Sequence, residues 1–253
     1  RINKKKTILL NTQYSRSSNI FRFDKMNDTK EGVSKYKNWY YGPHIRFLQN
    51  INYTYKEKTI AFDNIKTSIS FQDIEESRHT QKKEENFLNN RKENVKISDL
   101  NIDLKKQIGQ LKIAYGIGRR HQEISSNANL SNNSLVFYNT TRYPDEGSEV
   151  VDFFIYNQIT IQLNRKLNLL IGGRWNNNNL VAKFDNPTFS FEDIKNNNTS
   201  FVKSVFILFK ARSNMTINAS YYGGFRNPNI DDVGKVFSKD DINVVIPNAN
   251  LRP

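Results

Sequence analysis

Apolar and polar residues alternate with a period of two along most of this sequence. In residues 64–72, Ile65, Ile69 and Phe71 share one face and Lys66 and Gln72 share the other. Successive side chains of a strand point to opposite faces, so this period predicts strands rather than helices. The pattern gives about nine candidate strands: residues 6–15, 44–55, 64–72, 92–105, 111–118, 151–163, 167–176, 201–210 and 215–225.

The connections between these strands alternate strictly in length. Short links are expected at residues 56–60, 106–109, 164–166 and 211–214, and long ones at 16–42, 77–91, 126–148 and 177–199. In an antiparallel sheet this alternation gathers every long link at one end, as in outer-membrane barrels with short periplasmic turns and long extracellular loops. We therefore predict an all-β fold, an antiparallel transmembrane β-barrel. About nine strands form only part of such a barrel, and 22 strands are expected for transporters with a plugged lumen.

The composition permits a membrane barrel although no long apolar run is present. Only 37% of the residues are hydrophobic, and the mean hydropathy is -0.71. A transmembrane strand needs only about 9–11 residues that are apolar on one face, so outer-membrane lipid is an expected partner. Aromatic residues near the expected strand ends, such as Tyr14, Trp39, Trp175 and Tyr221, suit interfacial girdles. Aromatic pairing in a soluble sheet would explain them equally well.

The charge and the cysteine count exclude several classes of function. The chain has no cysteine, which excludes disulfides, thiolate metal sites and a cysteine nucleophile. The net charge of +13 comes from 38 basic and 25 acidic residues. The basic residues are scattered, and the pair at 82–83 is followed by two glutamates, so we predict no nucleic-acid partner. The excess favours an anionic ligand.

Two motifs near the end of the chain resemble the late-barrel signature of TonB-dependent outer-membrane receptors. The sequence reads F-R-N-P and N-A-N-L where many such receptors read F-R-A-P and N-P-N-L. The motif residues are Phe225, Arg226, Asn227, Pro228, Asn248, Asn250 and Leu251. Three further segments resemble receptors of this family from Bacteroidetes: WYYGPHIR at 39–46, FQDIEESRH at 71–79 and TRYPDEGS at 141–148.

This resemblance implies energised uptake of a scarce nutrient, such as an iron chelate or siderophore, across the outer membrane of a Gram-negative bacterium. The ligand would be a small molecule or chelate, and the TonB complex would act through a plug domain. Residues 1–253 would be a barrel fragment, with the signal peptide, the plug and the last strands lying outside it. No enzyme activity and no cofactor are expected. A passive porin or structural outer-membrane barrel is the alternative, and a soluble β-sandwich is a third possibility.

The resemblance also points to residues that meet the ligand. The two motifs belong to a ligand loop in which Pro228 suits the start of a short helix. Haem receptors of the family carry a histidine between the motifs, whereas residues 229–247 contain none. Five residues are expected near strand ends, where they form either a polar funnel or a solvated, mutually paired rim: Arg78, His79, Arg119, Arg120 and His121. We predict no catalytic residues and no metal shared by His44, His79 and His121.

Overall fold

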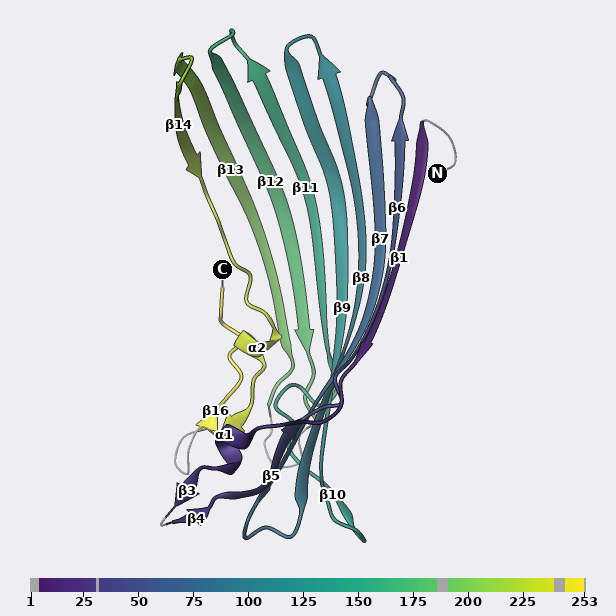
Figure 1. Cartoon of the computed structure of the whole chain (residues 1–253), viewed down its shortest axis with the longest axis vertical. Helices are drawn as coiled ribbons and strands as arrows, with labels where there is room; N and C mark the ends of the chain where they lie inside the picture. The colour runs from purple at the N-terminus through teal and green to yellow at the C-terminus, as the bar shows by residue number, and fades with distance from the viewer. Residues whose placement is uncertain (1–4, 31, 186–190, 239–243, 253) are drawn as a thin grey trace.

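A computed structural model describes residues 5–30, 32–185, 191–238 and 244–252 as a tall curved wall of strands, one layer thick (Figure 1). Nine strands lie side by side in sequence order, and each pairs antiparallel with the next. They are β1 (Lys6–Arg16), β6 (Ile45–Lys56), β7 (Asn64–Lys82), β8 (Leu88–Ile108), β9 (Leu111–Ser131), β11 (Ser148–Gln162), β12 (Leu167–Ala182), β13 (Ile194–Arg212) and β14 (Met215–Tyr222). The predicted number and direction of the strands are confirmed.

The remaining elements lie at the lower end of the wall, opposite the tight turns (Figure 1). β7 is longer than β6, so β5 can pair with β7 beyond the end of β6. β10 pairs in a similar way with the far end of β9. The elements are β2 (Ile20–Phe21), α1 (Phe23–Met26), β3 (Thr29–Lys30), β4 (Val33–Ser34), β5 (Tyr36–Tyr41), β10 (Val136–Tyr138), α2 (Ile230–Val233), β15 (Phe237–Ser238) and β16 (Val244–Val245).

The strands are longer than the sequence pattern predicts, and the expected loops at 77–91, 126–148 and 177–199 were wrong in extent. β9 alone has 21 residues, or about 70 Å of strand against a hydrocarbon core of about 30 Å. Asparagines that read as loop residues instead form a ladder in which Asn177 Nδ2 donates to Asn197 Oδ1 over 2.9 Å. Beyond the membrane, polar side chains suit both faces of a strand, so polarity does not mark the strand's end.

The register gathers apolar side chains on one face of the wall. Ile117 pairs with Ile155, Ile155 with Trp175, and Trp175 with Phe201, in one continuous row. All four side chains are exposed. The neighbouring β7 and β8 continue the band with exposed residues such as Ile69 and Leu100. An apolar surface of this extent is unfavourable in water, so we expect this outer face to contact lipid.

The opposite, inner face is polar. Ser68 Oγ donates to Asn52 Oδ1 over 2.6 Å, and the Tyr156 hydroxyl donates to Asp103 Oδ1 over 2.6 Å. The other two sheets among the described residues, β15–β16 and β3–β4, have only two strands each, so they do not form the second layer of a sandwich. The buried apolar cluster is small and lies on this inner face at the long-loop end, where Ile124, Val150, Leu180, Ala182, Ile194 and Val233 meet.

A glycine on the inner face allows two strands to pack closely and supplies a test of the wall. A methyl group on Gly116 would overlap the carbonyl oxygen of Ile102 and lie 2.7 Å from the Tyr156 ring. We expect Gly116→Ala to lower the free energy of unfolding in lipid vesicles by about 1–3 kcal/mol, because the backbone oxygen cannot move aside. Gly223→Ala is the control, since an added Cβ there meets nothing within 4 Å. Equal effects of the two substitutions on urea denaturation would contradict this packing.

Candidate ligand-binding site

The segment after β14 folds back onto the inner face of the wall. Its short helix α2 buries Val233 completely against the apolar cluster that includes Leu180 and Ile194. Two hydrogen bonds tie the segment down further: Val236 N donates to the Arg142 carbonyl, and Asn196 Nδ2 donates to the Leu251 carbonyl. The end of the chain therefore covers part of the wall near the long loops (Figure 1).

A reciprocal cap fixes the start of α2. The Asn229 side chain accepts a hydrogen bond from Asp232 N, and the Asp232 carboxylate accepts one from Asn229 N, both over 3.0 Å. The backbone hydrogen bond from Asn229, followed by the side-chain hydrogen bond from Arg226, holds the pKa of Asp232 below its ordinary value. The predicted helix start at Pro228 is wrong by two residues, because Asn229 caps the helix and Ile230 begins it.

The two motifs flank this helix and hold the loop together. Arg226 forms a 2.6 Å ion pair with Asp232, and the backbone N of Asn248 donates to the Val233 carbonyl over 2.8 Å. Leu251 packs against the apolar cluster. Asn227 and Pro228 line a cavity, whereas the structure places the remaining motif residues outside its lining: Phe225, Arg226, Asn248, Asn250 and Leu251. Their direct contact with a ligand stays a prediction.

The cavity lies between the inner face and the folded-back loop, and its volume is about 580 Å³. The wall contributes residues from β7, β8, β9, β11 and β12, and the connection between β10 and β11 contributes Arg142 and Tyr143. Its lining residues are Ile74, Glu76, Arg78, Glu93, Val95, Gln122, Ile124, Arg142, Tyr143, Val150, Asp152, Asn178, Asn227, Pro228, Asn229, Ile230 and Asp231. This cavity joins the wall to the motif loop, the segment after β14 that carries the two motifs.

A polar network closes one side of the cavity. The Tyr143 hydroxyl donates to Asp231 over 2.8 Å, and Lys235 forms an ion pair with the same carboxylate over 3.0 Å. Burial and this hydrogen bond raise the pKa of Tyr143 to about 12. Burial alone would raise the pKa of Asp231, but the hydrogen bonds from Tyr143 and Lys235 hold it below its ordinary value. Asp231 is therefore ionised and has partners of its own.

Charged residues of β7 and β8 meet at the other side. Glu76 faces Glu93 across the strands, and Arg78 faces Arg91. Burial raises the pKa of Glu93, although Arg78 and Arg91 act in the opposite direction. Burial lowers the pKa of Arg91, and the nearby Arg78 adds to this shift. Arg91 and Glu93 could not be found from the sequence, because only the strand register brings them opposite Arg78 and Glu76. Arg142 could not be found either, because the connection between β10 and β11 has to fold back to bring it to the cavity.

The five expected rim residues do not form one funnel. Arg78 lines the cavity, and Arg120 faces inward and bonds to Asp99 over 2.6 Å. His79, Arg119 and His121 fall on the outer face, because adjacent strand residues alternate. His79 stacks on Tyr40 with 4.6 Å between ring centroids, and His121 contacts Glu149 over 2.7 Å. The described residues contain no group of His, Asp or Glu placed to hold a metal ion.

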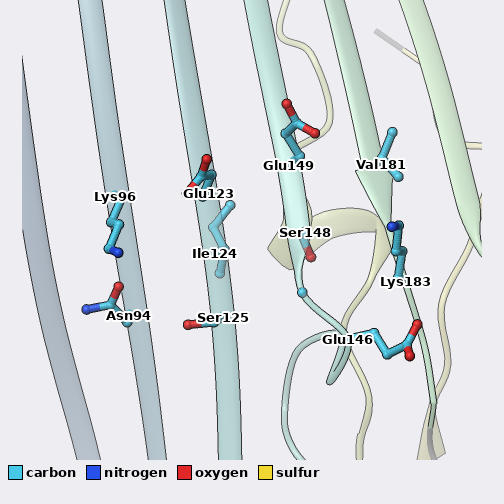
Figure 2. A pocket seen from close by; sticks show the side chains of 11 residues that line it. Asn94, Lys96, Glu123, Ile124, Ser125, Glu146, Ser148, Glu149, Val181 and Lys183 are labelled. Atoms are coloured by element: carbon cyan, nitrogen blue, oxygen red, sulfur yellow. The ribbon is translucent and has the colours of Figure 1, made fainter.

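A second hollow of about 450 Å³ opens near the point where β11 begins (Figure 2). Most of its labelled side chains, including Lys96, Glu123 and Glu149, belong to the outer face by register. The hollow has mixed charge and does not include any residue of the motif loop. We therefore place the candidate ligand site in the inner cavity.

Residues 3–253 match the sequence profile of the family described as TonB dependent receptor-like, beta-barrel. The chain belongs to the TonB-dependent receptor family. TonB-dependent receptors are transporters rather than enzymes, in agreement with the prediction of no enzyme activity. The partial antiparallel barrel expected from the sequence is confirmed as the receptor barrel fold. No curated protein matches the sequence at a significant level. No helix among the described residues is long and apolar enough to cross a membrane.

Solved receptor structures share this fold at low sequence identity. The copper transporter OprC superposes with a TM-score of 0.70 at 8% identity, over 96% of this chain and 39% of OprC. The siderophore receptor PiuA from Acinetobacter baumannii gives 0.60 at 13%, over 91% of this chain and 41% of PiuA. The ferric citrate transporter FecA gives 0.56 at 15%, over 86% of this chain and 33% of FecA. The chain thus spans less than half the length of each of these receptors.

The cap of α2 makes the attachment of the loop depend on pH. Because the folded pKa of Asp232 is depressed, its contribution is complete above the unfolded value of about 3.9. This contribution is lost as the pH falls through the folded pKa. We expect amide exchange in residues 229–234, corrected for intrinsic rates, to lose protection as the pH falls below about 4 toward the depressed folded pKa of Asp232. Asp232→Asn should give low protection at every pH. Asn229→Ala, which removes the capping side chain, should lower the stability of the α2 segment by about 1 kcal/mol.

The matched control for this pH dependence is Glu84→Gln, in the exposed turn between β7 and β8. It should leave the exchange profile of residues 229–234 unchanged. Protection that persists in Asp232→Asn at neutral pH would contradict the role of the cap.

Proposed function

We propose that this chain forms part of the wall of an outer-membrane receptor that takes up a scarce nutrient, such as an iron chelate, in a Gram-negative bacterium. The outer apolar band suits lipid, and the polar inner face suits a water-filled lumen. The candidate cavity lies at the end where the long connections gather (Figure 1), which would be the extracellular end. A ligand from outside would therefore reach the cavity before it reaches the membrane-spanning part of the wall.

The observation that carries this proposal is the inner cavity covered by the motif loop. Val233 is completely buried against the wall, and Asn196 holds the Leu251 carbonyl over 2.8 Å. A covered site retains its ligand until the cover or the opposite side of the site moves. Release into the cell then requires a source of work, which supports coupling to the TonB complex through a plug domain.

The class of ligand is proposed from relatives and from one absence in the sequence. The solved structures with the same fold include a copper transporter, a ferric citrate transporter and a siderophore receptor. A metal or a metal chelate is therefore the proposed cargo. Haem is disfavoured, because the stretch between the motifs, residues 229–247, contains no histidine to ligate its iron.

The passive-porin alternative has less support in this geometry. A porin needs an open aqueous path along its inner face. Here the motif loop packs on that face through α2, and Arg226, Asn229 and Asp232 brace it. Energised uptake explains a cover of this kind, whereas passive diffusion gains nothing from it.

Transport by the full-length receptor tests the proposal. We expect cells that produce it to accumulate radiolabelled ferric chelate under iron limitation, and to lose this uptake when TonB is deleted. The variant Val233→Asp should still insert into the membrane, but the motif loop should no longer pack on the wall. Uptake by this variant should therefore fall. Uptake that proceeds equally well without TonB would support the porin and contradict the receptor.

A further inference from the structure

Two like-charge pairs follow one another on the inner face of β7 and β8. Glu76 lies directly opposite Glu93, and two residues further along Arg78 lies directly opposite Arg91. Like charges that face each other across a strand pair are destabilising. Exchanging Arg91 and Glu93 would turn both pairs into favourable ones at no cost in composition. The arrangement therefore separates an acidic row, Glu76 and Glu93, from a basic row, Arg78 and Arg91.

The two rows influence each other only through space, since Arg78 and Arg91 oppose the rise in the pKa of Glu93. No hydrogen bond or ion pair joins Glu76 or Glu93 to Arg78 or Arg91 in the part of the chain that the structure describes. Glu76 lies instead 3.6 Å from His44 Nε2. The Nε atoms of Arg78 and Arg91 are buried without a hydrogen-bond partner. The Arg78 guanidinium lies over the Tyr41 ring, 5.3 Å from its centroid, but this contact does not supply the missing hydrogen bond. Burying an N–H group without a hydrogen bond is costly, and departures of this kind from local rules concentrate at functional sites.

An apolar row lies next to the acidic row, on the side away from the basic row. Ile74 pairs with Val95 on the same face, and Val95 pairs with Ile124. Successive rows on one face of a strand are about 7 Å apart. The wall thus presents apolar, acidic and basic rows in order. Ile74, Val95, Glu76, Glu93 and Arg78 line the same cavity of about 580 Å³, and Arg91 lies opposite Arg78 outside its lining.

We propose that this cavity recognises a zwitterionic ligand. Its cationic group would lie between Glu76 and Glu93, and its carboxylate would bind Arg78. The chain between the two charges would span the step from the acidic to the basic row, and an apolar extension beyond the cationic group would cover Ile74 and Val95. Charge-assisted hydrogen bonds would add partners for Glu93 and for the Arg78 guanidinium. This inference rests on the proposed function, because it names the ligand class of the same site.

The overall charge of +13 is no guide to this site. The cavity lining contains four acidic residues (Glu76, Glu93, Asp152 and Asp231) and two arginines (Arg78 and Arg142). Asp231 already pairs with Lys235, and Asp152 accepts a hydrogen bond from Asn178 over 2.7 Å. A ligand with only negative charge would meet Arg78 but would also be repelled by the adjacent glutamates. The preference for a purely anionic ligand that the net charge suggested is therefore not expected here.

Binding of three small probes to the purified full-length receptor in detergent tests the proposal. The probes are 6-aminohexanoate, which carries both charges on one flexible chain, and hexanoate and hexylammonium, which each carry one. Isothermal titration calorimetry should show 6-aminohexanoate binding at least about tenfold more tightly than either single-charge probe. Equal affinity for hexanoate and 6-aminohexanoate would overturn the proposal.

An exchange of charges separates recognition from folding. The double variant Arg91→Glu with Glu93→Arg keeps the net charge but makes each cross-strand pair one of opposite charges. We expect its melting temperature to rise and its preference for 6-aminohexanoate to disappear. A lower melting temperature would assign the rows a structural role, and a retained preference would place recognition elsewhere. Either result overturns the proposal.

The control exchange uses the outer face of the same two strands. Lys92 and Glu75 form an ion pair over 2.6 Å there, so Lys92→Glu with Glu75→Lys should leave probe binding unchanged. Binding and transport can also fail separately. Loss of probe preference with intact uptake would refute only the zwitterion inference, whereas intact binding without TonB-dependent uptake would refute only the transport role.

Discussion

Hydrogen bonding between neighbouring strands fixes which side chains of this wall face outward and which face the lumen. A slip of one residue in any strand would move its apolar residues inward and its polar residues into lipid. In β9 the register places Ile117 in the outer band and Gly116 beneath the Tyr156 ring. The same register brings Glu76 opposite Glu93 in the cavity wall. Lipid contact, close packing and the candidate site therefore share one cause.

The length of the strands determines where a ligand can bind. β8 and β9 each have 21 residues, far more than a membrane crossing of about 9–11 residues needs. The extra residues of these strands extend the wall beyond the lipid-facing band. On the inner face of this extension, Val95 and Ile124 belong to the apolar cluster against which the motif loop packs. Because α2 is capped and its Val233 is buried there, the loop covers a cavity.

Local patterns in the sequence were sufficient for the fold but not for the site. The alternation of apolar and polar residues, as from Ile65 to Phe71, identified the strands. A strand with one apolar face shows this alternation in its own sequence. The ladder from Asn177 to Asn197 escaped notice, because strands in water on both faces have no apolar signal. Arg119 and Arg120 looked like one cluster but face opposite sides. The pairs at Glu93 and Arg91 depend on register across strands, which no single segment reveals.

The most direct test is a spin-label scan along β9. This chain has no cysteine, so single cysteines at residues 112–124 of the full-length receptor in lipid vesicles, Gly116 and Gly118 excepted, can each carry a label. Oxygen accessibility should be high at 113, 115 and 117 and low at 112 and 114. At 119, 121 and 123 a water-soluble relaxant should replace oxygen as the better quencher. Accessibility without a period of two, or water contact at 115 and 117, would contradict a lipid-facing wall.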